Sequence, residues 1–167
     1  VVDNPALLRA LKGGRLAGAV LDVWENEPDP DVDLVARTRI ATPHIAGYSF
    51  DGKIAGTRMM AEAIGRFLGA PFGWPEGLGA QERRSTVPLG GEGREAVRSA
   101  VLSAYPIGED DARMRGILDL TPPERPAFFD RLRKEYPVRR EFHQHAPPGG
   151  ISDESALEIL AALGFVW

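Results

Sequence analysis

Two short apolar runs, each followed by a side chain suited to proton transfer, constrain this chain more than any other feature. Ala17 to Val23 is followed by Glu27, and Arg39 to Thr42 is followed by His44. Short continuous apolar runs are typical of strands buried in a parallel sheet. Because ligands bind beyond the carboxyl ends of the strands in open α/β sheets, we expect Glu27 and His44 to lie together at one crevice.

A carboxylate beside an imidazole is an arrangement suited to acid–base chemistry. The negative charge can raise an imidazole pKa and fix which ring nitrogen carries the proton. Such a pair can move a proton to or from a substrate hydroxyl near neutral pH. Taken alone, Glu27 before Pro28 is more often the start of a loop, and His44 after Pro43 is more often a structural histidine. The hypothesis therefore depends on the two residues together.

Local patterns predict mostly helices around these strands. Asn4 is the expected N-cap of a helix that has Pro5 at its first position and stops at Gly13-Gly14. A long helical pattern covers Lys53 to Leu68, and the Pro- and Gly-rich stretch Pro71 to Gly79 is expected to be a linker. The other expected elements are a helical turn over 32–36, a strand over 84–89, helices over 94–105, 110–119, 125–136 and 153–163, and a loop over 145–150.

The composition narrows the possible functions. A net charge of −4 argues against a general nucleic-acid binder, and the absence of cysteine excludes disulfides and thiolate metal sites. No apolar run approaches the ~20 residues of a membrane span, which favours a soluble, cytoplasmic protein. His143 and His145 lack carboxylate or thiolate neighbours at metal-site spacing, so we expect a solvated loop there and no metal.

Several sequence words carry a family resemblance. The words are Val1 to Leu8, Gly18 to Trp24, Glu27-Pro28 and Thr42 to Gly47. Together they resemble the second half of the nucleotide-binding domain of D-2-hydroxyacid dehydrogenases. Within that family, Asp22-Val23-Trp24 and the run from His44 to Lys53 are most similar to the 4-phosphoerythronate dehydrogenases of vitamin B6 biosynthesis. Phe128 to Phe142 and Ser152 to Phe165 resemble the C-terminal dimerisation domain of that branch.

The resemblance implies an α/β fold made of three parts. Residues 1–48 would be the C-terminal part of a Rossmann-like NAD-binding domain, and residues 49–72 a helix returning to the substrate-binding lobe. Residues 73–167 would form a small α+β dimerisation domain, giving a homodimer. Apolar faces for that contact are expected at Val97 and Val101 and at Leu157 and Leu160.

The resemblance also assigns roles to individual residues. His44 would take the proton of the substrate's C2 hydroxyl as the hydride passes to NAD, and Glu27 would orient His44. Asp22 would lie near the nicotinamide, the backbone of Gly47 against the cofactor, and the phenol of Tyr48 against the substrate. Plainer explanations are a strand-end cap for Asp22, a turn for Gly47 and a core aromatic for Tyr48. The substrate would be 4-phospho-D-erythronate, oxidised to 2-oxo-3-hydroxy-4-phosphobutanoate.

Other parts of a complete dehydrogenase are missing from the sequence. It contains no Gly-x-Gly-x-x-Gly turn for the dinucleotide phosphates, and the family's substrate-binding arginine would precede Val1. We therefore expect the chain to be the C-terminal portion of the enzyme, inactive alone. Alternatives are another D-2-hydroxyacid dehydrogenase, such as a glyoxylate, hydroxypyruvate or phosphoglycerate enzyme, a non-catalytic corepressor-like relative, or a separate dimerisation module.

The pair Arg139-Arg140 raises a hypothesis about the substrate phosphate. Arginine is well suited to bind a phosphate that is shielded from bulk water, and this pair follows a predicted helix on what we expect to be a short turn. Either side chain would then reach the phosphate, in the same or a partner subunit. The alternative is a surface pair salt-bridged to Glu135 or Glu141.

Overall fold

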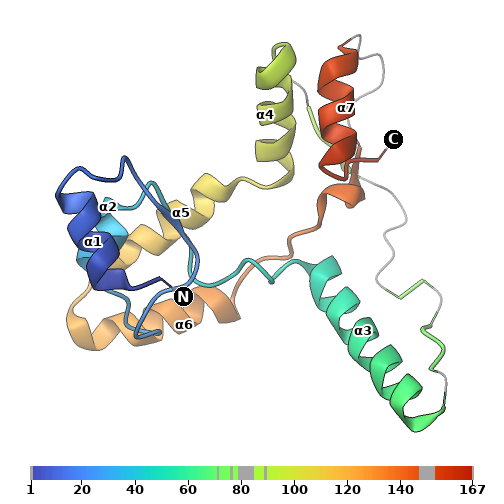
Figure 1. Ribbon diagram of the computed structural model, residues 1–167, viewed down its shortest axis with the longest axis horizontal. Helices are drawn as coiled ribbons and strands as arrows, with labels where there is room; N and C mark the ends of the chain where they lie inside the picture. Colours follow the sequence, from blue (N-terminus) through green and yellow to red (C-terminus); the bar gives the residue numbers. More distant parts are fainter. Residues whose placement is uncertain are drawn as a thin grey trace. The chain divides into compact units, whose positions relative to one another are not determined.

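The chain forms two compact units, each made of two separate stretches of sequence. The computed structural model describes residues 2–70, 72–75, 77–78, 85–88, 90–146 and 153–166. The first unit contains Val1–Ala46 and Ile107–Pro137, and the second contains Gly47–Pro106 and Val138–Trp167. Helices predominate over strands in this mixed α/β protein (Figure 1). In the described ranges, no helix combines the length and the apolar character needed to cross a bilayer.

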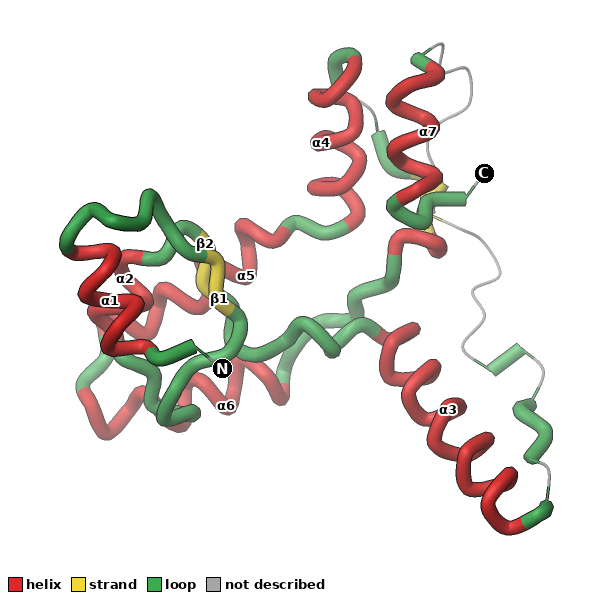
Figure 2. Tube along the Cα trace, in the orientation of Figure 1, coloured by secondary structure: helices red, strands yellow, loops and turns green. Residues whose placement is uncertain are grey.

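The first unit contains a minimal parallel sheet covered by helices. Its elements are α1 (Asn4–Lys12), β1 (Val20–Leu21), α2 (Val32–Arg37), β2 (Ile40–Ala41), α5 (Ile107–Arg115), α6 (Arg125–Lys134) and the 3-10 turns η1 (Gly116–Asp119) and η2 (Pro122–Glu124). Strands β1 and β2 are parallel, with Val20 opposite Ile40 and Leu21 opposite Ala41 (Figure 2). This pairing brings the loops after both strands to the same edge.

Helix α1 begins differently from the prediction. Asp3, not Asn4, is the N-cap, and its carboxylate accepts the N–H of Ala6 at 2.7 Å. Asn4 is instead buried, and its side-chain oxygen accepts the N–H of Glu25 at 3.3 Å. Asp and Asn cap helices about equally well, so the tertiary contact to Glu25 decides which of the two residues caps.

The expected buried strand over 17–23 is only partly confirmed. The regular strand is limited to Val20–Leu21, and Val20 is 62% exposed rather than buried on both faces. Among the described residues, β1 pairs with β2 alone, so its other edge has no neighbouring strand to bury it. The sequence pattern is therefore that of an inner strand, although the strand observed lies at an edge.

The segment Ile107–Pro137 packs into the same hydrophobic core as the N-terminal residues. That core contains Trp24, Leu34, Val35, Ala41, Met114, Ile117 and Phe129. Met114, Ile117 and Phe129, from the later segment, are fully buried, and each such side chain contributes about 1.5–3 kcal/mol. Polar contacts reinforce the docking of the segment, since Arg115 donates to the carbonyl of Thr38 at 2.8 Å and Asp111 accepts the N–H of Ala41 at 2.8 Å.

The second unit is built around a pair of helices and a second short sheet. Its elements are α3 (Phe50–Leu68), β3 (Ser85–Thr86), α4 (Gly93–Ala104), η3 (Phe142–Gln144), β4 (His145–Ala146) and α7 (Glu154–Ala162). Helices α4 and α7 enclose a core of Val87, Ala100, Ala104, Leu160 and Phe165, with Val97, Val101 and Phe142 packed against it. The faces predicted to mediate dimerisation thus pack largely inside this unit.

The predicted loop over 145–150 is wrong at its start. His145 and Ala146 form β4, which pairs in parallel with β3, with Ser85 opposite His145. His145 is 9% exposed, so the expectation of a solvated His-x-His pair holds only for the exposed His143. Burial lowers the pKa of His145. The predicted loop residues 147–150, like parts of the predicted linker, lie outside the described residues.

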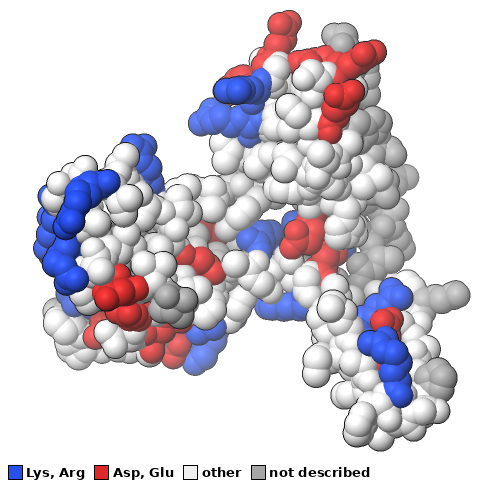
Figure 3. All heavy atoms as spheres, in the orientation of Figure 1, with Lys and Arg blue, Asp and Glu red and all other residues white. Residues whose placement is uncertain are grey.

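Helix α3 is well capped at both ends but leaves much of its apolar surface exposed. Ser49 caps it by accepting the N–H of Gly52 at 3.0 Å, which starts the helix earlier than predicted, and Gly69 ends it in the left-handed conformation. Exposed apolar side chains gather in its C-terminal half: Met59, Met60, Ile64, Phe67 and Leu68. Figure 3 shows a narrow file of charged side chains along this helix, flanked by uncharged surface.

Candidate active site

Glu27 and His44, predicted to lie together, are in direct contact. The Nδ1 atom of His44 lies 2.7 Å from Oε2 of Glu27. The Glu27 side chain is 18% exposed and the His44 side chain 44% exposed, so a ligand can reach the imidazole while the carboxylate is largely covered. An ionised carboxylate only accepts hydrogen bonds. The contact therefore favours a proton on Nδ1 and leaves Nε2 to exchange a proton with a ligand.

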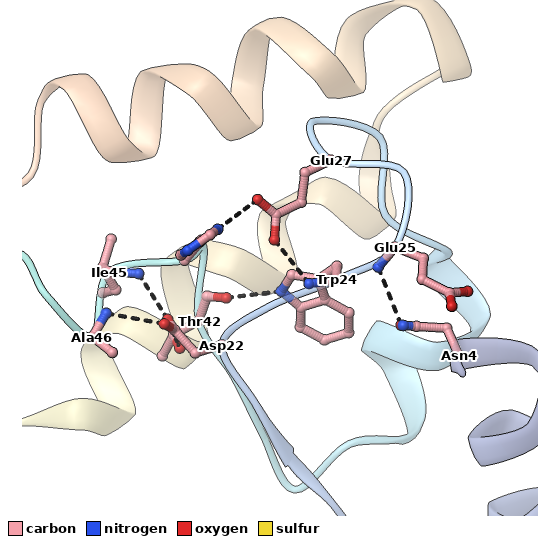
Figure 4. A network of polar contacts seen from close by, with 9 residues as sticks. Asn4, Asp22, Trp24, Glu25, Glu27, Thr42, Ile45 and Ala46 are labelled. Atoms are coloured by element: carbon pink, nitrogen blue, oxygen red, sulfur yellow. Dashed lines mark hydrogen bonds and ion pairs between the residues drawn. The ribbon is translucent and has the colours of Figure 1, made fainter. Parts of the chain in front are cut away.

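Trp24 contacts Glu27 and the strand end that precedes His44. Its backbone N–H donates to Oε1 of Glu27 at 2.8 Å, while its indole N–H donates to the carbonyl of Thr42 at 2.9 Å (Figure 4). Trp24 as a whole is only 3% exposed and belongs to the core. Besides packing in the core, Trp24 therefore makes two hydrogen bonds. Both oxygens of Glu27 are consequently engaged, which fixes the plane of the carboxylate.

Asp22 points into the loop that carries His44. Its Oδ1 accepts the hydroxyl of Thr42 at 2.7 Å and the N–H of Ile45 at 2.7 Å, and its Oδ2 accepts the N–H of Ala46 at 3.0 Å (Figure 4). The sequence predicted a cofactor contact for Asp22, and that role stays a prediction. The sequence did not predict these three hydrogen bonds, although Asp22 and Thr42 directly follow the paired strands β1 and β2.

His44 has an uncommon backbone conformation. Its φ is 57°, in the left-handed region that few residues other than glycine adopt. Such a conformation costs about 1–3 kcal/mol and persists only where surrounding contacts impose it. Hydrogen bonds to Thr42 on one side and to Ile45 and Ala46 on the other supply those contacts. Strained residues of this kind concentrate at functional sites.

Gly47 and Tyr48 belong to the second unit. Among the described residues, a Cβ added to Gly47 would meet nothing within 4 Å, so none of these residues requires glycine there on steric grounds. The ring of Tyr48 lies 4.2 Å beneath the ammonium of Lys53, close enough for a cation–π contact. Their roles toward cofactor and substrate remain predictions.

The Arg139-Arg140 pair has partners that the sequence did not suggest. Arg140 donates to Asp51 through Nε at 3.0 Å and Nη2 at 2.7 Å, and Arg139 lies 4.4 Å over the ring of Tyr105. Burial alone would raise the pKa of Asp51, but Arg140 and the N–H of Glu141 together hold that pKa below its usual value. The sequence did not suggest Asp51 as a partner of Arg140, while a salt bridge of the pair to Glu135 or Glu141 and a contact with the substrate phosphate both stay predictions.

Two segments of this chain match known protein families. Residues 1–46 match the family described as D-isomer specific 2-hydroxyacid dehydrogenase, NAD binding domain, and residues 85–164 match a domain of unknown function, DUF3410. The second match spans both structural units, because α5 and α6 lie in the first unit and α4 and α7 in the second.

Similar proteins share one name. The erythronate-4-phosphate dehydrogenase of Salinibacter ruber is 44% identical over 156 residues, which are 89% of this chain and 40% of that protein. The enzyme of the same name from Marinobacter nauticus is 40% identical over 99% of this chain and 44% of its own length, and that from Yersinia enterocolitica is 41% identical over 99% and 43%. The chain thus spans about two fifths of the length of these relatives. These matches confirm the resemblance inferred from the sequence: the chain is similar to proteins named erythronate-4-phosphate dehydrogenase, and its residues 1–46 match the NAD binding domain of D-isomer specific 2-hydroxyacid dehydrogenases.

Proposed function

We propose that the full-length protein containing this chain oxidises 4-phospho-D-erythronate to 2-oxo-3-hydroxy-4-phosphobutanoate with NAD, in pyridoxine biosynthesis. The observation that carries the proposal is the 2.7 Å contact between His44 and Glu27 beyond two parallel strands. The names of the relatives supply the substrate class. The chain alone would be inactive, since it has no glycine-rich phosphate turn.

Proton transfer is the part of the reaction that this chain performs. Nε2 of His44 takes the proton of the C2 hydroxyl while the C2–H bond breaks and the C2=O bond forms. Glu27 keeps the ring oriented through Nδ1 and stabilises the imidazolium that results. The backbone N–H of Trp24 keeps Glu27 in place throughout. NAD, when bound, accepts the hydride from C2.

The residues at this edge fit the nicotinamide end of the cofactor. A half-exposed imidazole whose Nδ1 is engaged by a carboxylate can act as the general base for a substrate hydroxyl. Asp22 accepts three hydrogen bonds, and a carboxylate has about four acceptor positions, so one position is left for an amide group. A contact of Asp22 with the cofactor is therefore compatible with its bonds to the loop.

The domain assignment is part of the same proposal. The exposed apolar residues of α3 suit a helix that packs against a substrate-binding lobe, which is the role expected for residues 49–72. For the homodimer, apolar side chains of the second unit remain exposed on and after α7, namely Ile159, Leu163 and Val166. Light scattering on the full-length protein at micromolar concentration should give a dimer, and a clean monomer would refute this part.

A substrate panel tests the activity. The full-length protein should reduce NAD with 4-phospho-D-erythronate and show a clearly higher kcat/KM for it than for erythronate, 3-phosphoglycerate, glycerate or lactate. A preference for one of the other acids would move the protein to another branch of the family. No NAD reduction with any of these acids would overturn the proposal.

A further inference from the structure

We propose that Asp22 is a positioning residue, which holds the backbone of His44 in its left-handed conformation and so directs the imidazole toward the substrate hydroxyl. The inference rests on the proposed function for its kinetic consequences, but the conformational claim stands on geometry alone. The family resemblance assigns Asp22 only to the cofactor.

The hydrogen bonds of Asp22 bracket His44 in the sequence. One donor, the hydroxyl of Thr42, lies two residues before His44, and two donors, the N–H groups of Ile45 and Ala46, follow it. All three bonds have lengths between 2.7 and 3.0 Å. A single carboxylate thus fixes the chain both before and after the residue with positive φ.

The carboxylate of Asp22 is a strong acceptor for these donors. Hydrogen bonds from backbone N–H groups to an ionised carboxylate are shorter and stronger than those between neutral groups. Consecutive N–H groups that converge on one anion are typical of a turn that contains a left-handed residue. In this chain the anion is the carboxylate of Asp22, which follows the neighbouring strand β1, so a side chain of the protein itself satisfies the two N–H groups.

Asp22 and Glu27 then divide the work of orienting His44. Glu27 contacts the imidazole ring itself at Nδ1, whereas Asp22 contacts only the loop backbone and Thr42. Loss of Glu27 would free the ring to rotate, but loss of Asp22 would move the whole residue. Since a displacement of about 1 Å can cost about 10²-fold in rate, the second effect should fall mainly on kcat.

The test compares three variants of the full-length protein. Asp22→Ala removes every acceptor, Asp22→Asn keeps one oxygen but presents an amide N–H₂ in place of the other, and Thr42→Val removes one donor without touching the carboxylate. We expect kcat to fall by about 10²-fold, about tenfold and less than tenfold, in that order, and any weakening of NADH binding to be smaller than the fall in kcat. Asp33→Asn is the matched control, because Asp33 is an exposed carboxylate of the same unit that pairs with Lys12, and it should leave kcat unchanged.

A second readout does not depend on turnover. Hydrogen exchange at the amides of Ile45 and Ala46, measured without ligand, should be faster in Asp22→Ala and Asp22→Asn than in the wild type. If the wild type oxidises none of the acids, the proposed function fails, yet this exchange still tests the positioning claim. Unchanged exchange at both amides would overturn the claim. So would weaker NADH binding with unchanged kcat, which would make Asp22 a cofactor contact only. If Asp22→Ala does not fold, Asp22→Asn and Thr42→Val still decide between these results.

Discussion

Asp22 in the first unit and Asp51 in the second each accept three hydrogen bonds, but the donors differ in charge. In the second unit, Asp51 accepts two bonds from the guanidinium of Arg140 and one from the N–H of Glu141. In the first unit, Asp22 accepts bonds only from neutral donors, a hydroxyl and two backbone N–H groups. Arg140 neutralises Asp51, whereas these donors leave the charge of Asp22 uncompensated.

This difference separates a structural pair from a site. The largely buried ion pair of Asp51 and Arg140 connects the start of α3 to the segment before η3, and its two charges cancel. The neutral donors of Asp22 bring no positive charge to the loop of His44, where an imidazolium would form during proton transfer. The comparison predicts that changes near Asp22 affect turnover, while changes near Asp51 affect stability.

The largest expected effect is on turnover in the first unit. In the full-length enzyme, His44→Ala should lower kcat by about 10²–10⁴-fold, because no general base remains for the hydroxyl proton. Steady-state kinetics across pH will measure it. His143→Ala, at an exposed histidine of the second unit, is the control and should keep wild-type kcat. Near-wild-type turnover of His44→Ala would contradict the prediction that changes in the first unit affect turnover.

The next effect is on the stability of the second unit. Arg140→Met removes one partner of a pair whose side chains are 19% and 8% exposed and leaves Asp51 without its counter-charge. Breaking a buried pair in this way costs about 3–5 kcal/mol, and the remaining exposure of Arg140 places the expected cost at the lower end. Urea denaturation gives the value. Arg98→Met, which breaks an exposed pair with Glu95, should change little, and equal losses in the two variants would contradict the assignment.

A smaller effect on stability and on kcat is expected for Trp24, which bonds both Glu27 and Thr42. Trp24→Phe removes the indole donor and leaves the carbonyl of Thr42 unsatisfied, at a cost of about 1–3 kcal/mol. The backbone N–H that holds Glu27 is kept, so kcat should fall less than in His44→Ala. Thermal unfolding together with kinetics will show both values. Trp74→Phe is the same change in the second unit, and a larger loss of stability there would argue against a joining role for Trp24.

Acidification should weaken the second unit through Asp51. Because the pKa of Asp51 is lowered in the folded state from 3.8, its contribution to stability is fully present above that value. It is lost as pH falls through the lower folded pKa. Stability measured from pH 6 to pH 2 should therefore drop less steeply in Asp51→Asn than in the wild type. Parallel curves for the two proteins would show that this pair carries no pH-dependent stability.

The sequence predicted those features that depend on local pattern and on short words. The helices at α1, α3, α4, α6 and α7 and the approach of Glu27 to His44 followed from apolar spacing and from two strand ends. The pairing of Asp51 with Arg140 was not predicted, because the residues are separated by 89 positions and neither has a distinctive neighbour pattern. The packing of α5 and α6 onto the N-terminal core was missed for the same reason, since an apolar helix face does not specify its partner.

Within the site, the sequence predicted residue types but not all their contacts. Glu27 and His44 were found because their side chains define a known chemistry. The bonds of Asp22 involve the backbone of Ile45 and Ala46, and backbone donors leave no trace in the residue types. The left-handed φ of His44 was likewise invisible, because glycine, the usual signal for that conformation, is absent at this position.

The central claim is that Glu27 fixes the tautomer and direction of His44 so that Nε2 receives the substrate proton. The most direct test is nitrogen-15 NMR of His44 in the full-length protein. The spectrum is recorded at a pH high enough for the imidazole to be neutral. The contact at Nδ1 predicts a protonated Nδ1 and a bare Nε2 in the wild type, and a mixture of tautomers in Glu27→Ala. A bare Nδ1 with the proton on Nε2 in the wild type would contradict the account.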